Sequence, residues 1–166
     1  MKYRVAWYGL LLSVVLNMVL AALLWHSGRQ EASALTTNLY LMDGEGENWT
    51  VVNYKVVIDQ ERIKRGEARL RYIGSMANDQ SEYFGIEVIE DHETVYNTIH
   101  TSQGGPVSIY ENLGNFGSIT SPFGADDIKP ERTSLENTII QITWKDNQGE
   151  IHSERIPMSI TDEIAI

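Results

Sequence analysis

The side chains that could bind metals or transfer protons are few and scattered along this chain of 166 residues. The chain has no cysteine, so it has no disulfide, thiolate metal ligand or cysteine-linked lipid. The histidines are not spaced as metal ligands: they are His26, His92, His100 and His152. The run Glu90-Asp91-His92-Glu93 could hold a hard cation, although a solvated turn between two strands explains it equally well.

Three more acids, Asp43, Glu45 and Glu47, alternate with glycine and could supply oxygen ligands to Ca²⁺. A flexible acidic segment ahead of the first strand explains them more simply. The sequence contains no Gly-x-Ser-x-Gly elbow, no His-Glu-x-x-His and no phosphate-binding glycine loop. We therefore predict no catalytic residues, no cofactor and no metal.

Charge is distributed unevenly along the chain. Residues 55–71 carry six cations against three acids, a local balance of +3, whereas residues 72–166 carry sixteen acids against four cations. Such an uneven field can steer a charged partner. The candidate contacts for an anionic partner, such as a cell-wall polymer, are Arg62, Lys64, Arg65, Arg69 and Arg71. Alternatively, Arg69 and Arg71 are the exposed face of a strand, paired with acids. The net charge of −10 argues against nucleic acid as the partner.

Four large aromatic residues could form a stacking platform for a ligand or fill a core. Large aromatics in β-proteins usually lie between sheets, so we expect Tyr54, Tyr72 and Trp144 to be buried. Trp49 stands at the entry of a predicted strand, and both interpretations stay open for it.

The element ahead of these residues is an uncharged run at residues 5–25. As a helix it would be roughly 30 Å long, the thickness of a bilayer's hydrocarbon core. Trp7, Tyr8 and Trp25 mark its ends, where aromatic rings favour the headgroup layer. We predict a transmembrane anchor at residues 1–26, a stalk at 27–43 and an extracytoplasmic domain at 44–166.

Lys2 and Arg4 precede the run, which predicts a single-pass protein of the cell membrane with a cytoplasmic N-terminus and an extracellular domain. The alternative is a signal peptide cleaved after the small residues Ala32-Ser33-Ala34. The apolar run is longer than a typical signal sequence and ends in tryptophan, so we favour the anchor. Small or polar residues recur every fourth position and mark a candidate helix-packing face: Gly9, Ser13, Asn17 and Ala21.

From Trp49 onward apolar residues recur with a period of two, as in half-buried strands. Residues 39–41 could make a first contact with the domain, and the stretch 107–113 reads as a further short strand. Asp146-Asn147-Gln148-Gly149 has turn chemistry between two such runs, and residues 114–134 show little alternation. These patterns predict an all-β, Ig-like antiparallel sandwich of about seven strands, preceded by one transmembrane helix.

The segment Gly44-Glu45-Gly46-Glu47-Asn48-Trp49, with Tyr54 in the strand that follows, resembles the start of a group of uncharacterised exported proteins of Bacillus-like bacteria. Residues 70–74 and 142–149 resemble later landmarks of the same group. Members typically are lipoproteins or carry one membrane span, so the resemblance implies an envelope location and a β-fold, without an activity.

Together these features predict a non-catalytic interaction or structural module of the bacterial cell envelope. The expected partners are the membrane and a cell-wall polymer or an envelope protein. The alternative is an accessory subunit of a membrane complex, recruited through its transmembrane helix.

Overall fold

The computed structural model describes residues 17–19, 37–76, 79–115, 117–124 and 129–166. Residues 36–166 form one compact unit, and Asn17, Met18 and Val19 are helical. Most of the predicted anchor, including Gly9, Ser13 and Ala21, and most of the predicted stalk lie outside the described residues. Among those that are described, no helix combines the length and apolar character needed to cross a bilayer.

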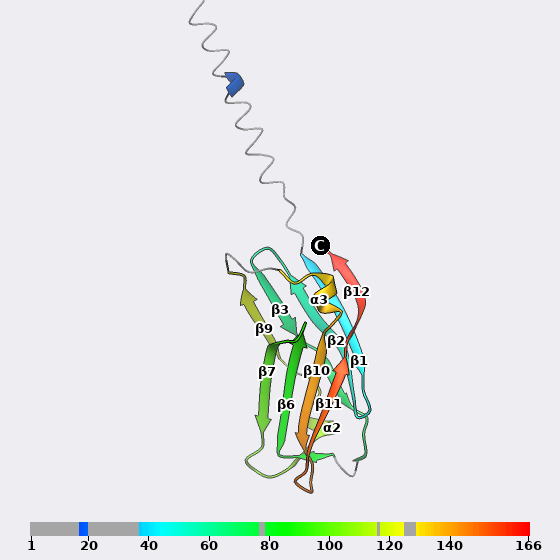
Figure 1. Ribbon diagram of the computed structural model, residues 1–166. Coiled ribbons are helices and arrows are strands. Elements are labelled where there is room, and N and C mark those ends of the chain that lie inside the picture. Colours follow the sequence, from blue (N-terminus) through cyan, green and yellow to red (C-terminus); the bar gives the residue numbers. More distant parts are fainter. Residues whose placement is uncertain (1–16, 20–36, 77–78, 116, 125–128) are drawn as a thin grey trace, which may run out of the picture. The chain divides into compact units, whose positions relative to one another are not determined.

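The compact unit contains two larger antiparallel sheets (Figure 1). The six-stranded sheet is built around β2 (Trp49–Ile58), which pairs with β1 on one side and with β3 and β4 on the other. Its remaining strands, in sheet order, are β12 (Ser159–Ala165), β1 (Asn38–Glu45), β3 (Arg62–Gly66) and β9 (Ser118–Pro122), with β4 (Arg69–Tyr72) beside the first half of β2.

The four-stranded sheet has the order β11 (Ile151–Pro157), β10 (Ile139–Lys145), β6 (Tyr83–Glu90) and β7 (Glu93–Thr101). The short strands β5 (Gln80–Ser81) and β8 (Val107–Ser108) pair separately. The only regular helices in the described part of the compact unit are the four-residue segments α2 (Ile109–Asn112) and α3 (Arg132–Leu135). The prediction of a mostly β, antiparallel domain is confirmed.

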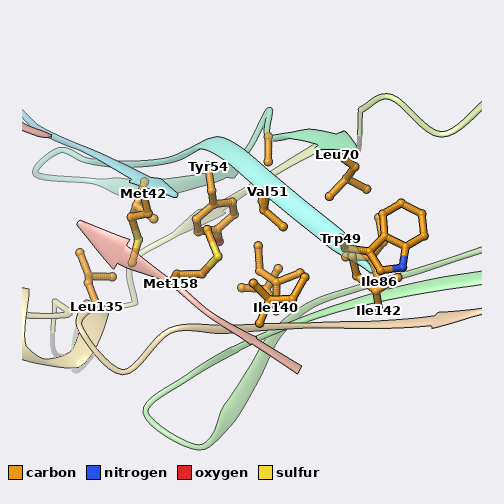
Figure 2. Packing of buried hydrophobic residues seen from close by; sticks show 14 of the residues in the cluster. Met42, Trp49, Val51, Tyr54, Leu70, Ile86, Leu135, Ile140, Ile142 and Met158 are labelled. Atoms are coloured by element: carbon orange, nitrogen blue, oxygen red, sulfur yellow. The ribbon is translucent and has the colours of Figure 1, made fainter. Parts of the chain in front are cut away.

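The core lies between the inner faces of the two larger sheets. Trp49 of β2 is fully buried, and its ring centroid lies 5.2 Å from that of Phe84 on β6 and 5.9 Å from that of Trp144 on β10. Tyr54 and Met42 from the six-stranded sheet and Ile140 from the four-stranded sheet fill the middle of the same core (Figure 2). Tyr54, Tyr72 and Trp144 are buried as predicted, and Trp49, which the sequence left open, is also a core residue.

The register of β2 changes halfway along the strand. Trp49 and Val51 point inward, and so do Tyr54 and Val56. Two residues lie between Val51 and Tyr54, where regular alternation would have one. Asn53 there has φ of 58°, and the pairing with β1 shifts at the same level. A strict period of two through this run predicts Val52 on the same face as Tyr54. This prediction is wrong, because the bulge turns Val52 toward solvent.

Several segment boundaries differ from the sequence pattern. The described residues contain twelve strands rather than about seven, because β3, β4, β5, β8 and β9 have only two to five residues each. The stretch 107–113 is a strand for two residues and then the helix α2, which begins where the Ser108 hydroxyl accepts the Glu111 N–H. Strand β9 lies within 114–134, and helix α3 begins there and ends at Leu135. Strand β1 begins at Asn38, inside the range assigned to the stalk.

Candidate functional site

Four of the five predicted anion contacts lie on the outer face of the six-stranded sheet. Arg62 and Lys64 alternate with inward residues on β3, and Arg69 and Arg71 do so on β4. Because β3 and β4 both pair with β2, these side chains flank one strand. We call this group, together with Lys55 of β2, the basic surface.

The fifth predicted contact, Arg65, lies on the opposite face of the sheet. It is 9% exposed and forms two hydrogen bonds with the carboxylate of Glu90, which is 5% exposed. Nε donates to Oε1 at 2.8 Å and Nη2 donates to Oε2 at 2.7 Å. Arg65 is therefore not part of the exposed basic surface. Side chains alternate along a strand, so the position of Arg65 two residues after the inward-facing Ile63 indicates that Arg65 also faces inward.

The Arg65–Glu90 pair links the two larger sheets. Tyr54 of β2 adds a third group, since its hydroxyl donates to Glu90 Oε1 at 3.5 Å. Burial, followed by the negative charge of Glu90, raises the pKa of Tyr54 above its ordinary value. Tyr54 therefore stays protonated, and both oxygens of Glu90 are already accepting hydrogen bonds. The three residues form a satisfied buried cluster rather than an acid or base poised for proton transfer.

Acids neutralise part of the basic surface. Lys55 and Lys64 both pair with Glu67, and Arg62 Nε lies 2.9 Å from Asp59 Oδ2. The hydrogen bonds from the two lysines lower the pKa of Glu67. Neither Arg69 nor Arg71 forms an ion pair with any residue that the structure describes. Both are exposed, so they are the cations of this surface best placed to meet an anion.

The run Glu90-Asp91-His92-Glu93 forms the turn of the β6–β7 hairpin. Asp91 and His92 have φ of 47° and 74°, and Glu90 pairs with Glu93 across the turn. Two positive φ values fit a tight two-residue hairpin of the primed class. The turn borders a hollow of about 640 Å³ whose floor is the Arg65–Glu90 pair and whose wall includes Phe123.

A second polar cluster, which the sequence reasoning missed, lies at the β10–β11 turn. Asp146, Glu150 and His152 bring their ligand atoms within 4.8 Å of one another. One oxygen of Asp146 accepts the N–H groups of Gln148 and Glu150, each at 2.9 Å, and the other lies 2.8 Å from His152 Nε2. These bonds, with that to His152 the largest contribution, lower the pKa of Asp146.

The structure gives this turn a folding role. The His152 ring stacks on Trp144 at 5.3 Å between centroids, so the cluster joins the turn to the aromatic core. Both oxygens of Asp146 accept hydrogen bonds from within the hairpin, so the carboxylate holds the turn and the returning strand together. The signal in the sequence was the Asp146 turn followed by a histidine on the returning strand.

Among the three acids before β2, Asp43 has a structural partner, and Glu45 and Glu47 are exposed. Asp43 Oδ1 accepts the N–H of Asn53 at 2.7 Å and so supports the bulge of β2. Glu45 lies at the exposed end of β1.

A scan against protein-family models, a search of curated proteins and a search of solved structures each found no match to the chain.

Proposed function

We propose that this chain is a membrane-anchored module of the bacterial cell envelope that binds or supports other envelope components and catalyses no reaction. The observation that carries the proposal is the uncharged run at residues 5–25, preceded by Lys2 and Arg4. It places a single span in the membrane, the N-terminus in the cytoplasm and the β-domain outside. The resemblance of residues 44–49 to exported proteins of Bacillus-like bacteria agrees with this location.

The pairing of the buried polar groups supports a non-catalytic role. Arg65, Glu90 and Tyr54 bond to one another, and Asp79, 6% exposed, accepts from the Ser108 hydroxyl and the Tyr110 N–H. Catalytic groups are usually left poised near a cleft with shifted proton affinities. Here the buried carboxylates and Arg65 bond to neighbouring strands and turns, whereas the buried indole N–H groups of Trp49 and Trp144 have no hydrogen-bond partner among the described residues.

The fold that we propose is an Ig-like sandwich. Two antiparallel sheets enclose a core in which Trp144 packs against residues of the opposite sheet, as a buried tryptophan does in Ig-like domains. A domain of this class exposes its outer sheet faces and its edge strands. These surfaces suit binding, and the basic surface is the one that suits an anionic wall polymer.

Fractionation of cells that express the full chain tests the proposal. We expect the protein to remain in the membrane pellet after washing with alkaline carbonate and to keep its original N-terminus. A matched variant with Leu12→Arg and Leu16→Arg should leave the pellet, because two central charges make insertion unfavourable. Recovery of wild-type protein in the soluble fraction, beginning near Leu35, would contradict the proposal and favour the cleaved signal peptide.

A second candidate role is an accessory subunit recruited through the span. Gly9, Ser13, Asn17 and Ala21 recur every fourth residue, and small residues let helix backbones approach closely. A membrane two-hybrid assay of the full chain tests this role with the variants Gly9→Ile and Asn17→Leu. A signal from wild type that falls in both variants supports it, and equal signals from all three would mean that the helix is only a tether.

A further inference from the structure

Gly85 occupies a position where the fold does not require glycine. It lies in the middle of β6, between Phe84 and Ile86, which are buried in the core. Its φ is outside the left-handed region, so the backbone there accepts any residue. Gly85 is itself buried, and the three atoms nearest to a Cβ there would all belong to Tyr83, at 3.4 Å for the hydroxyl oxygen and 3.8 Å for two ring carbons, so the Tyr83 ring lies against the glycine. Glycine weakens a strand, and it often marks a place where a ligand approaches the backbone.

The missing side chain leaves a hollow of about 120 Å³ on the outer face of the four-stranded sheet. Gly85 pairs with Thr143 of β10 on one side and with Ile99 of β7 on the other. These three strands lie side by side in the sheet (Figure 1). The hollow is thus framed by a hydroxyl side chain and an exposed isoleucine, with the end of the Tyr83 ring beside Gly85.

The next row of the sheet offers hydrogen-bonding groups. Glu87 pairs with Gln141 on β10 and with Asn97 on β7, and all three line the hollow. The side-chain amides of Gln141 and Asn97 make no hydrogen bond to any residue that the structure describes. Each amide can donate and accept at once. Glu87 is the one charged residue among those lining this hollow.

We propose that this hollow, which we call the Gly85 site, binds a neutral sugar residue of an envelope polysaccharide. A sugar ring has C–H groups that pack on an aromatic ring or an isoleucine, and hydroxyls that bond to amides and carboxylates. The hollow is small, so it takes one substituent of the sugar while the ring rests on Tyr83 and Ile99. The single carboxylate and the two amides suit a neutral ligand, unlike the basic surface on the other sheet.

The inference rests on the proposed function only for the source of the sugar. Binding of a sugar to purified protein does not depend on location, and membrane retention does not depend on sugar binding. Each experiment can therefore contradict its own proposal, sugar binding or membrane anchoring, without affecting the other.

Saturation-transfer NMR on the full chain in detergent micelles tests the proposal with two neutral probes, chitotetraose and maltotetraose. We expect transfer from wild type to at least one of them, with Kd between about 0.1 and 10 mM, and the comparison distinguishes an acetamido sugar from a plain hexose. Gly85→Val should weaken binding at least tenfold, because the new side chain fills the hollow. Gly104→Val is the matched control, since a Cβ at Gly104 meets nothing within 4 Å.

A second variant keeps the test valid if Gly85→Val does not fold, as judged by circular dichroism. The double substitution Asn97→Ala and Gln141→Ala removes both amides from the surface and should weaken binding to the same sugar at least fivefold. The absence of transfer from wild type to either probe at 10 mM would overturn the proposal. Binding by folded Gly85→Val equal to that of wild type would do the same.

Discussion

At the scale of single residues, the Arg65–Glu90 pair makes the sharpest prediction. Replacing Arg65 with Ala leaves the Glu90 carboxylate buried without its cation. Loss of one partner of a buried pair costs about 3–5 kcal/mol of unfolding free energy. We therefore expect a loss in this range in urea denaturation, whereas Arg62→Ala, at an exposed ion pair, should change stability little.

The double variant Arg65→Met with Glu90→Leu separates the charge effect from packing. It should recover most of the loss, since apolar residues of similar volume often replace a buried pair without cost. A loss below about 1 kcal/mol for Arg65→Ala would mean that Glu90 is hydrated and that the buried cluster does not hold the sheets together.

Asp146 predicts a pH dependence of stability. Its pKa in the folded state lies below its ordinary value of 3.8, chiefly because of the hydrogen bond to His152. The unfolded chain therefore binds a proton at higher pH than the folded one. The contribution of Asp146 is present above the unfolded pKa and is lost as pH falls through the folded pKa.

The variant Asp146→Asn should accordingly be less stable than wild type at pH 7, and the difference should shrink as pH falls below about 4. Urea denaturation at a series of pH values from 7 to 3 measures it. A difference that stays constant over this range would show that Asp146 has an ordinary pKa in the folded protein.

At the scale of elements, the turn between β1 and β2 depends on two glycines and one carboxylate. A Cβ at Gly46 would lie 1.8 Å from Glu154 Oε1, and one at Gly44 would lie 2.9 Å from the Pro157 carbonyl oxygen. Glu154 accepts the Asn48 N–H and its side-chain amide, at 3.0 Å through Oε2. The segment that resembles exported proteins thus docks against β11.

We expect Gly46→Ala to destabilise the domain by about 1–3 kcal/mol, because a new methyl group must displace Glu154 from its hydrogen bonds. Thermal unfolding, with Gly104→Ala as the control in an open loop, measures the effect. If both variants unfold at the same temperature as wild type, the approach of β11 to this turn is looser than described.

Prediction from sequence succeeded where strands were long and alternating, and it failed where tertiary contacts determine the local structure. The antiparallel β-domain followed from such runs, and the burial of Tyr54 and Trp144 followed from their size and aromatic character. The bulge at Asn53 could not be predicted in this way, because it depends on the hydrogen bond from the Asn53 N–H to Asp43 of the neighbouring strand. Strand β9 has no apolar alternation and exists because it pairs with β3.

The same contrast between local patterns and tertiary contacts holds for the candidate sites. The local excess of positive charge was enough to group Arg62, Lys64, Arg69 and Arg71, but it also included Arg65, which lies on the other face of the sheet. The partner of Arg65 comes from the other sheet, which no local pattern encodes, whereas the partners of Asp146 lie within six residues of it in the same hairpin. The Gly85 site needs three strands in register, so it was not visible in the sequence.

At the scale of the whole molecule, the basic surface predicts binding to anionic polymers. Arg69→Glu with Arg71→Glu reverses the two exposed cations of the basic surface that have no ion pair among the described residues. Retention on anionic wall polymer should fall and lose most of its salt dependence. The matched control, Lys145→Glu with Arg155→Glu, makes an equal charge change on the other sheet and should reduce retention less.

Equal retention of the double variant and wild type at low salt would remove the basic surface as a binding site. Net charge alone does not explain a difference between the two faces, because both double variants change the charge of the molecule by the same amount.

The most direct test of the account is the side of the membrane on which each end of the chain lies. The chain has no cysteine, so single cysteines can be introduced without background labelling. Tyr3→Cys reports on the N-terminus, and Gln103→Cys lies at an exposed position of the loop that follows β7. In intact cells, a membrane-impermeant maleimide should label Gln103→Cys and leave Tyr3→Cys unlabelled until the cells are lysed. Labelling of Gln103→Cys only after lysis would contradict an anchored, extracytoplasmic β-domain.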